Sequence, residues 1–199
     1  CFVDNNDYLH GGSVSFQRAA ISSPNYNRIQ ARYGYDISIP YYRRGGQNPD
    51  QEFKINASDA TQLQPQHIHR PRKYLLFFKG SMWLSHSYWG YQHRWLAKEY
   101  WPPDDPHIIA DIRCGRFQQH DIPSDQYFQY LQNTTFSFCP GGLSQGTFRF
   151  HESLAAGAIP IVTNDFLAPF EPELDWTGCL IRVSEARVID IPRLLTEIY

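Results

Sequence analysis

The chain has 199 residues and a formal net charge of −2 at pH 7, and 42% of its residues are hydrophobic, 16% aromatic and 19% charged. This length suits one compact domain, or one domain and part of another. The high aromatic and low charged fractions exclude disorder as the main state, and the nearly balanced charge removes the electrostatic argument for a nucleic-acid-binding protein. No apolar run reaches the roughly 18 residues that a membrane-spanning helix needs.

The first part of the chain, up to Arg72, is polar, rich in Gly, Pro, Asn and Tyr, and weakly periodic. Residues 35–39 alternate between polar and apolar side chains, which predicts a short strand that Pro40 ends.

From Arg72 onward, strand and helix patterns alternate. The continuous apolar run Tyr74–Phe78 is typical of a parallel strand that is buried on both faces, and Lys79 and Gly80 are expected to end it. Ser124 can cap a helix, and Gly157 can end the next one. Strands are expected at 74–78, 107–112, 134–139, 159–162 and 180–183, and helices near 94–98, 124–131, 147–156 and from 190 onward.

This alternation predicts an α/β fold with a doubly wound parallel sheet. In such sheets ligands bind beyond the carboxyl ends of the strands. The site should therefore lie among residues 79–80, Arg113, residues 140–146 and residues 164–165.

The segment 139–152 runs from a strand through a glycine-rich loop into a helix. The free N–H groups of a helix N-terminus favour phosphate. Arg149 and Glu152 are three residues apart and share a helix face, so Arg149 can bind a diphosphate and Glu152 the two hydroxyls of a ribose. A plain surface ion pair between the two residues is the structural alternative.

The same segment contains Gly142-Leu-Ser144-Gln-Gly146, which fits the nucleophile elbow of serine hydrolases. That chemistry needs an acid and then a histidine later in the chain. His151 is the only histidine after Ser144, and it belongs to the same predicted helix. A hydrolase that uses Ser144 therefore stays as an alternative.

The four cysteines lack metal-ligand spacing, so no metal site is predicted. They are expected to be buried thiols, and a disulfide, which needs an oxidising compartment, is the alternative. They are Cys1, Cys114, Cys139 and Cys179. Two glycosylation sequons, at Asn56 and Asn133, point to the secretory pathway.

A series of short motifs occurs in one order along most of the chain, and that order resembles the exostosins, glycosyltransferase family 47. The motifs include Lys73–Gly80, Asp111–Cys114, Asn133–Phe136, Gly146–Leu154, Gly157–Pro160 and Asp175–Trp176. The chain departs from the animal pattern at Gly141, where a basic residue is usual, and at Ser137, where a cysteine is usual.

The resemblance implies a GT-B architecture with two Rossmann-like domains facing a cleft. Residues 1–72 would be the end of the N-terminal, acceptor-side domain and a linker, and residues 73–199 a truncated C-terminal domain that binds the nucleotide-sugar. It implies an inverting transferase that moves a sugar from a UDP-sugar donor to a glycan acceptor and requires no cofactor, although a divalent metal stays open. It also implies a type II Golgi membrane protein with a lumenal catalytic region, a membrane anchor outside this sequence, and a homodimer or heterodimer.

The matching motifs also imply residue roles. Arg149 would hold the diphosphate, Glu152 the ribose, and Arg94 a second phosphate contact. The expected donor-binding residues are Gly80, Arg94, Arg113, Gly142, Ser144, Gly146, Thr147, Arg149 and Glu152.

An inverting transfer also needs a base for the acceptor hydroxyl. Asp36 is the first candidate and Asp165 and Glu171 are the next, although Asp36 has the alternative role of anchoring its own loop. A nucleotide- or glycan-binding module without turnover remains a further alternative for the whole chain.

Overall fold

The computed structural model describes residues 22–23, 28, 31, 36–39, 71–82, 90–115, 121–142 and 146–198. The strands are β1 (Ser22–Ser23), β2 (Ile37–Ser38), β3 (Tyr74–Met82), β4 (Ile108–Cys114), β5 (Thr134–Phe138), β6 (Ile159–Thr163) and β7 (Ile181–Val183). The α-helices are α3 (Gly90–Tyr100), α4 (Tyr127–Gln132), α5 (Phe148–Ala155) and α6 (Ile191–Ile198). The 3₁₀ helices are η2 (Ser124–Gln126) and η3 (Glu185–Asp190).

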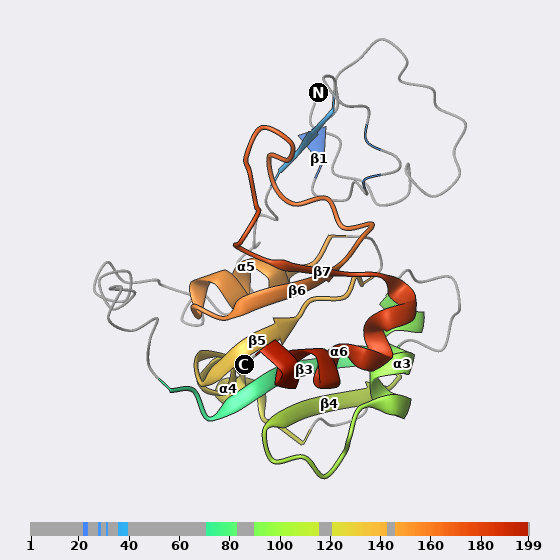
Figure 1. Ribbon diagram of the computed structural model, residues 1–199, viewed down its shortest axis with the longest axis vertical. Helices are drawn as coiled ribbons and strands as arrows, with labels where there is room; N and C mark the ends of the chain where they lie inside the picture. Colours follow the sequence, from blue (N-terminus) through green and yellow to red (C-terminus); the bar gives the residue numbers. More distant parts are fainter. Residues whose placement is uncertain are drawn as a thin grey trace.

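Five of the strands form one parallel sheet in the order β4-β3-β5-β6-β7 (Figure 1). Counted along the chain from β3, this is the order 2-1-3-4-5 of flavodoxin-like doubly wound folds. The predicted α/β class is confirmed, and the sheet is consistent with a domain of the GT-B type. The strand order reverses between β3 and β5, so the crevice at their carboxyl ends is the place where such a sheet binds ligands.

Helices cover both faces of this sheet. On one face, α3, η3 and α6 pack on a cluster that includes Leu76, Phe78 and Phe138. On the other face, α4 and the end of α5 pack over Phe77, and the start of α5 packs over Val162. Consecutive strand residues point to opposite faces, so the apolar run in β3 supplies both cores. This explains why that run shows no polar alternation.

Pairing between strands changes the strand ends that the sequence predicts. The prediction that Lys79 and Gly80 end their strand is wrong: they pair with Asp111 and Ile112, and the ladder continues to Met82 and Cys114. A strand continues as long as its neighbour offers hydrogen bonds, and local sequence does not contain that information.

The predicted helix that Ser124 caps also differs. Residues 124–126 form the 3₁₀ turn η2, and α4 begins at Tyr127 after Gln126, whose side chain makes no capping hydrogen bond. The helix predicted over 147–156 is confirmed as α5, with Thr147 as its N-cap, and the predicted stop at Gly157, which has a positive φ of 70°, matches the structure.

Strands β1 and β2 form a separate two-stranded parallel sheet beside the loop that joins β6 to β7 (Figure 1). The Phe170 N–H donates to the Ser38 carbonyl at 2.6 Å, and the Arg28 N–H donates to the Asp165 carbonyl at 3.0 Å. These backbone bonds join the early part of the chain to the carboxyl-end side of the main sheet. The division at residue 72 into two domains stays a prediction.

Within the described part of the chain, no helix has both the length and the apolar character that crossing a bilayer demands.

Candidate functional site

The first turn of α5 is attached to the carboxyl end of β3 by Arg149. Thr147 caps the helix, with its hydroxyl accepting the Arg149 N–H at 3.3 Å. The Arg149 guanidinium donates to the Lys79 carbonyl through Nε at 2.9 Å and through Nη2 at 2.5 Å. The cap and these two bonds hold the charge of Arg149 at the edge where the strand order reverses.

A second guanidinium reaches the same edge from the opposite face of the sheet. Arg94, on α3, is only 7% exposed. Its Nη1 donates to the Ser81 carbonyl at 2.6 Å, and its Nη2 donates to the Gly141 carbonyl at 2.9 Å. Arg94 therefore bridges the end of β3 and the loop that follows β5, across the crevice between the two strands.

Both guanidiniums lie near the ring of Phe78, with Cζ at 5.8 Å from the ring centroid for Arg94 and at 5.1 Å for Arg149. Two glycines leave space for them. A Cβ on Gly80 would lie 3.0 Å from Arg149 Nη2 and 2.8 Å from Phe78 Cζ, and a Cβ on Gly142 would lie 3.6 Å from Arg94 Nη2. The predicted site residues Gly80, Gly142, Arg94 and Arg149 are thus brought together.

This part of the site carries uncompensated positive charge. Among the described residues, no carboxylate lies within 4.0 Å of either guanidinium. The Nε of Arg94 is buried without a hydrogen-bond partner. Burial, and then the charge of Arg149, lower the pKa of Arg94 to about 9. Because burying like charges is costly, an anion bound here would stabilise both side chains.

Glu152 and Tyr127 form a hydrogen-bonded pair next to Arg149. The Tyr127 hydroxyl, from the start of α4, donates to Glu152 Oε2 at 2.9 Å. Arg149 and Glu152 share a helix face, as predicted, but the structure has no ion pair between them, so the simple ion-pair interpretation is wrong for this segment.

Tyr127 was not among the predicted site residues, because in the predicted helix its side chain shares a face with apolar residues such as Leu131. The sequence feature that could have indicated it is a tyrosine at the start of a helix, where an apolar residue without a hydroxyl would serve equally well for packing. Lys79 was expected to end its strand and to lie at the edge of the site, but no role was predicted for its side chain. Its side chain is 8% exposed, with Nζ 5.9 Å from the centre of the Tyr127 ring, and burial lowers its pKa.

Arg113 lies on β4, at the outer edge of the sheet. Its Nε is 3.4 Å from Asp111 Oδ1, and its Nη2 pairs with Asp121. Unlike Arg94 and Arg149, it already has carboxylate partners. Its predicted role in donor binding stays a prediction.

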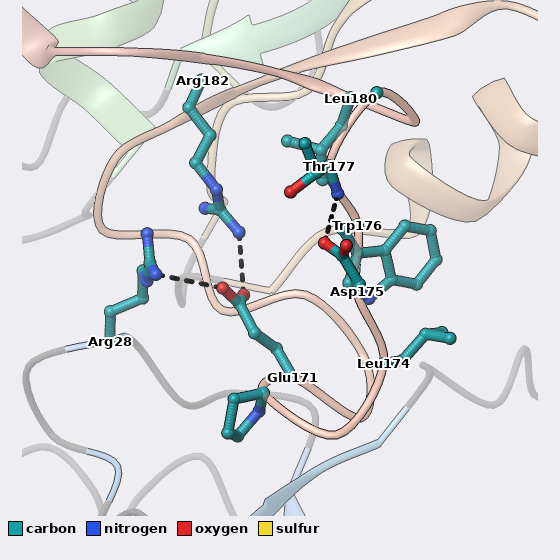
Figure 2. Close-up of a pocket in the computed structure, with 10 residues that line it drawn as sticks. Arg28, Glu171, Leu174, Asp175, Trp176, Thr177, Leu180 and Arg182 are labelled. Atoms are coloured by element: carbon teal, nitrogen blue, oxygen red, sulfur yellow. Dashed lines mark hydrogen bonds and ion pairs between the residues drawn. The ribbon is translucent and has the colours of Figure 1, made fainter.

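Glu171 lies in a pocket of about 460 Å³ between the β6–β7 loop and Arg28 (Figure 2). Its carboxylate is 3.1 Å from Arg28 Nη2 and 2.8 Å from Arg182 Nη2, and it accepts the Ala168 N–H at 3.0 Å. The Glu171 carboxylate is therefore already engaged by two arginines and a main-chain N–H. This arrangement favours a structural role, in which Glu171 joins the early chain to the β6–β7 loop.

The other two candidate bases are differently placed. Asp165 follows β6, and its Oδ1 accepts the Thr163 hydroxyl at 2.5 Å. Asp36 is 8% exposed and directly precedes β2. The segment that contains Asp36 and the loop that contains Asp165 are joined by the backbone hydrogen bond from the Phe170 N–H to the Ser38 carbonyl.

The remaining predicted residues lie as follows. Gly146 and Thr147 lead into α5. Asn133 is exposed at the end of α4, and its Nδ2 donates to the Gln129 carbonyl at 2.8 Å. Ser144 and Asn56 lie outside the described residues, so the hydrolase alternative is not tested by geometry.

Three of the four cysteines are described, and none of the three forms a disulfide. Cys139 is buried, with Sγ 3.3 Å from the Ser153 hydroxyl, and burial raises its pKa to about 11. Cys114 is half-buried and Cys179 is exposed, so the expectation of buried thiols holds only for Cys139. The described residues contain no group of three or more His, Cys, Asp or Glu side chains arranged to hold a metal ion.

Comparison with known proteins identifies the family. Residues 2–198 match the model of the Exostosin GT47 domain. The chain is 28% identical over 192 residues to Exostosin-1 of Drosophila melanogaster, which covers 90% of this chain and 24% of that protein. It is 28% identical over 205 residues to the Exostosin-1 homolog of Caenorhabditis elegans, which covers 98% of this chain and 50% of that protein.

A zebrafish relative gives a similar result: the chain is 29% identical over 198 residues to Exostosin-1c of Danio rerio, covering 94% of this chain and 26% of that protein. The chain therefore spans only a quarter to a half of the length of these relatives. Because the family model covers nearly all of it, the chain belongs to the Exostosin GT47 domain family.

Proposed function

We propose that this protein acts as a glycosyltransferase and that the carboxyl ends of β3 and β5 bind the diphosphate of a nucleotide-sugar, with UDP as the nucleotide. The observation that carries the proposal is the pair Arg94 and Arg149, whose guanidiniums meet at the reversal of strand order with no carboxylate partner among the described residues. Membership of the GT47 family supports the same reaction class.

The arrangement suits a diphosphate leaving group. Each guanidinium has five N–H donors and makes two hydrogen bonds to main-chain carbonyls, so other N–H groups remain for phosphate oxygens. The capped N-terminus of α5 adds partial positive charge. As the bond to the sugar breaks, negative charge grows on the diphosphate, and these fixed donors stabilise it. We propose that donor binding needs no metal ion, because the two arginines supply the positive charge.

The chemical step is proposed as a single inverting displacement. The oxygen of an acceptor hydroxyl attacks the anomeric carbon, the bond from that carbon to the diphosphate oxygen breaks, and the hydroxyl proton passes to a carboxylate. Asp36 and Asp165 are the candidate bases. Glu171 is the weakest of the three candidates, because its carboxylate is already paired with Arg28 and Arg182.

We extend the proposal to the setting of the protein. A glycan is the proposed acceptor, and the lumenal side of the Golgi is the proposed location, with a membrane anchor elsewhere in a longer protein. The two sequons at Asn56 and Asn133 support a secretory location. A homodimer or heterodimer stays open.

Calorimetric titration of UDP, with and without a metal chelator, tests the donor site. Arg149→Ala should weaken UDP binding about 10- to 100-fold, because it removes charge-assisted hydrogen bonds. Arg193→Ala is the matched control, because Arg193 is an exposed arginine on α6 that pairs with Glu197 at 2.6 Å. Equal UDP affinity in the wild type and in Arg149→Ala would refute the assignment.

Two further measurements separate the alternatives. Incubation with a panel of UDP-sugars and glycan acceptors should release UDP and form a new glycan. UDP binding without turnover on any member of the panel would favour the binding module. Covalent labelling of Ser144 by an active-site serine probe would favour the hydrolase.

A further inference from the structure

Tyr127 lies between the sheet and α5, where its ring packs on aromatic side chains and its hydroxyl is hydrogen-bonded to a carboxylate. Its ring packs on Phe77 with a centroid distance of 5.6 Å and against the edge of Phe128 at 5.1 Å. The ring therefore packs against two aromatic neighbours. Its hydroxyl reaches across to α5 and donates to Glu152 Oε2.

The protonation state of Tyr127 is well defined. Burial, and to a lesser degree the neighbouring Glu152, raise the pKa of Tyr127 well above its ordinary value. The phenol therefore stays protonated at neutral pH and always donates to the carboxylate. Glu152 is half-buried, and no described residue occupies its Oε1. The carboxylate thus has one oxygen oriented by the protein and one available as an acceptor.

Glu152 is also correctly spaced from the proposed diphosphate position. It lies three residues after Arg149, which is about 4.5 Å along a helix axis. In a nucleotide, the ribose ring separates the 2′ and 3′ hydroxyls from the phosphate by a comparable length. A nucleotide with its diphosphate on Arg149 can therefore place its ribose diol against the carboxylate of Glu152.

We propose that Tyr127 is a positioning residue for ribose recognition: by holding Glu152 Oε2, it orients the carboxylate toward the ribose diol and makes the site select ribonucleotides over 2′-deoxyribonucleotides. The inference rests on the proposed function, because it needs a nucleoside diphosphate in this site. It goes further because it assigns the preference for ribose over 2′-deoxyribose to Tyr127 on α4 and Glu152 on α5.

The test compares the affinities of the protein for UDP and for 2′-deoxy-UDP by calorimetry. The wild type should bind UDP about tenfold more tightly, the effect of one hydrogen bond to a charged group. Tyr127→Phe should reduce this ratio to about twofold and leave the affinity for 2′-deoxy-UDP nearly unchanged. A merely structural role for Tyr127 would lower both affinities together.

Tyr130→Phe is the matched control. Tyr130 lies on the same helix, stacks on Tyr74 at 5.4 Å, and its hydroxyl makes no hydrogen bond to a described residue. It should keep the wild-type ratio. Glu152→Gln provides a second variant that keeps the side-chain shape, and it should reduce the ratio as Tyr127→Phe does.

The outcomes separate this inference from the proposed function. A Tyr127→Phe variant that keeps the full ratio, or that loses affinity for both nucleotides equally, overturns the inference. Equal binding of both nucleotides by the wild type also overturns it but leaves the diphosphate site intact. A wild type that binds neither nucleotide contradicts the proposed function itself.

Discussion

Arg94 and Arg149 approach the ring of Phe78 from helices on opposite faces of the sheet, and each is held there by main-chain carbonyl oxygens rather than by a carboxylate. Carbonyl oxygens orient a guanidinium without neutralising its charge. The two positive charges therefore remain available to an anion at the end of β3.

The small size of Gly80 keeps this arrangement in place. Gly80→Ala would bring a Cβ to 2.8 Å from Phe78 Cζ and 3.0 Å from Arg149 Nη2, so both side chains must move. We expect a loss of about 1–3 kcal/mol in the free energy of unfolding, as for other overpacked sites, and weaker UDP binding. Urea denaturation and calorimetry measure the two effects.

Gly142→Ala is the control for this substitution. Its Cβ would lie 3.6 Å from Arg94 Nη2, an ordinary van der Waals distance. Its cost in stability should be clearly smaller than that of Gly80→Ala. Equal costs for the two variants would show that the close packing around Gly80 is not what stabilises this edge.

The cap of α5 should contribute measurably to stability. Thr147→Ala removes the hydroxyl that accepts the Arg149 N–H and should lower the free energy of unfolding by about 1 kcal/mol. Thr147→Ser keeps the acceptor and should lose less. Thr147 is only 6% exposed, so its methyl group is also packed. A Ser variant as unstable as the Ala variant would mean that this methyl group contributes more to stability than the capping hydrogen bond does.

Stability should depend on pH through His93. This α3 residue is 7% exposed, its Nδ1 has no partner, and burial lowers its pKa below the ordinary 6.5 despite the nearby charges of Asp165 and Glu185, with Arg94 adding to the decrease. Below pH 6.5 the unfolded chain binds a proton that the folded chain does not, so the free energy of unfolding falls as the pH decreases. Above pH 6.5 the residue is neutral in both states and the effect disappears.

Urea denaturation at pH 7.5 and 5.5 measures this dependence. His93→Asn should lose less stability between these two pH values than the wild type does. The exposed His107 provides the control, and His107→Asn should keep the wild-type dependence. An unchanged dependence in His93→Asn would contradict the prediction.

Glu171 should prove structural. Glu171→Gln leaves Arg28 and Arg182 without their shared carboxylate and should cost about 1–3 kcal/mol of stability. If Glu171 were the catalytic base instead, the variant would keep its stability and lose turnover with UDP-sugars. Asp165→Asn, measured in the same assay, tests the competing assignment of the base.

The site shows why its residues were only partly predictable. Arg149 and Glu152 are three apart in sequence, and helix geometry alone places them on one face. Arg94 entered through the family motif, but its contacts with Ser81 at the end of β3 and with Gly141 depend on how α3 packs on the sheet. Tyr127 was not predicted, because its partner Glu152 lies 25 residues further along the chain.

By itself the sequence determined the elements and the family. Strand and helix patterns from residue 72 onward predicted the doubly wound α/β class, because periodicity and glycine positions are local properties, and the ordered motifs predicted the exostosin family. Only the tertiary structure decided where β3 ends, which arginines have no carboxylate partner in the part of the chain that the structure describes, and which acid pairs with two arginines. Those outcomes depend on hydrogen bonds and charges that meet across the sheet, between residues far apart in the chain.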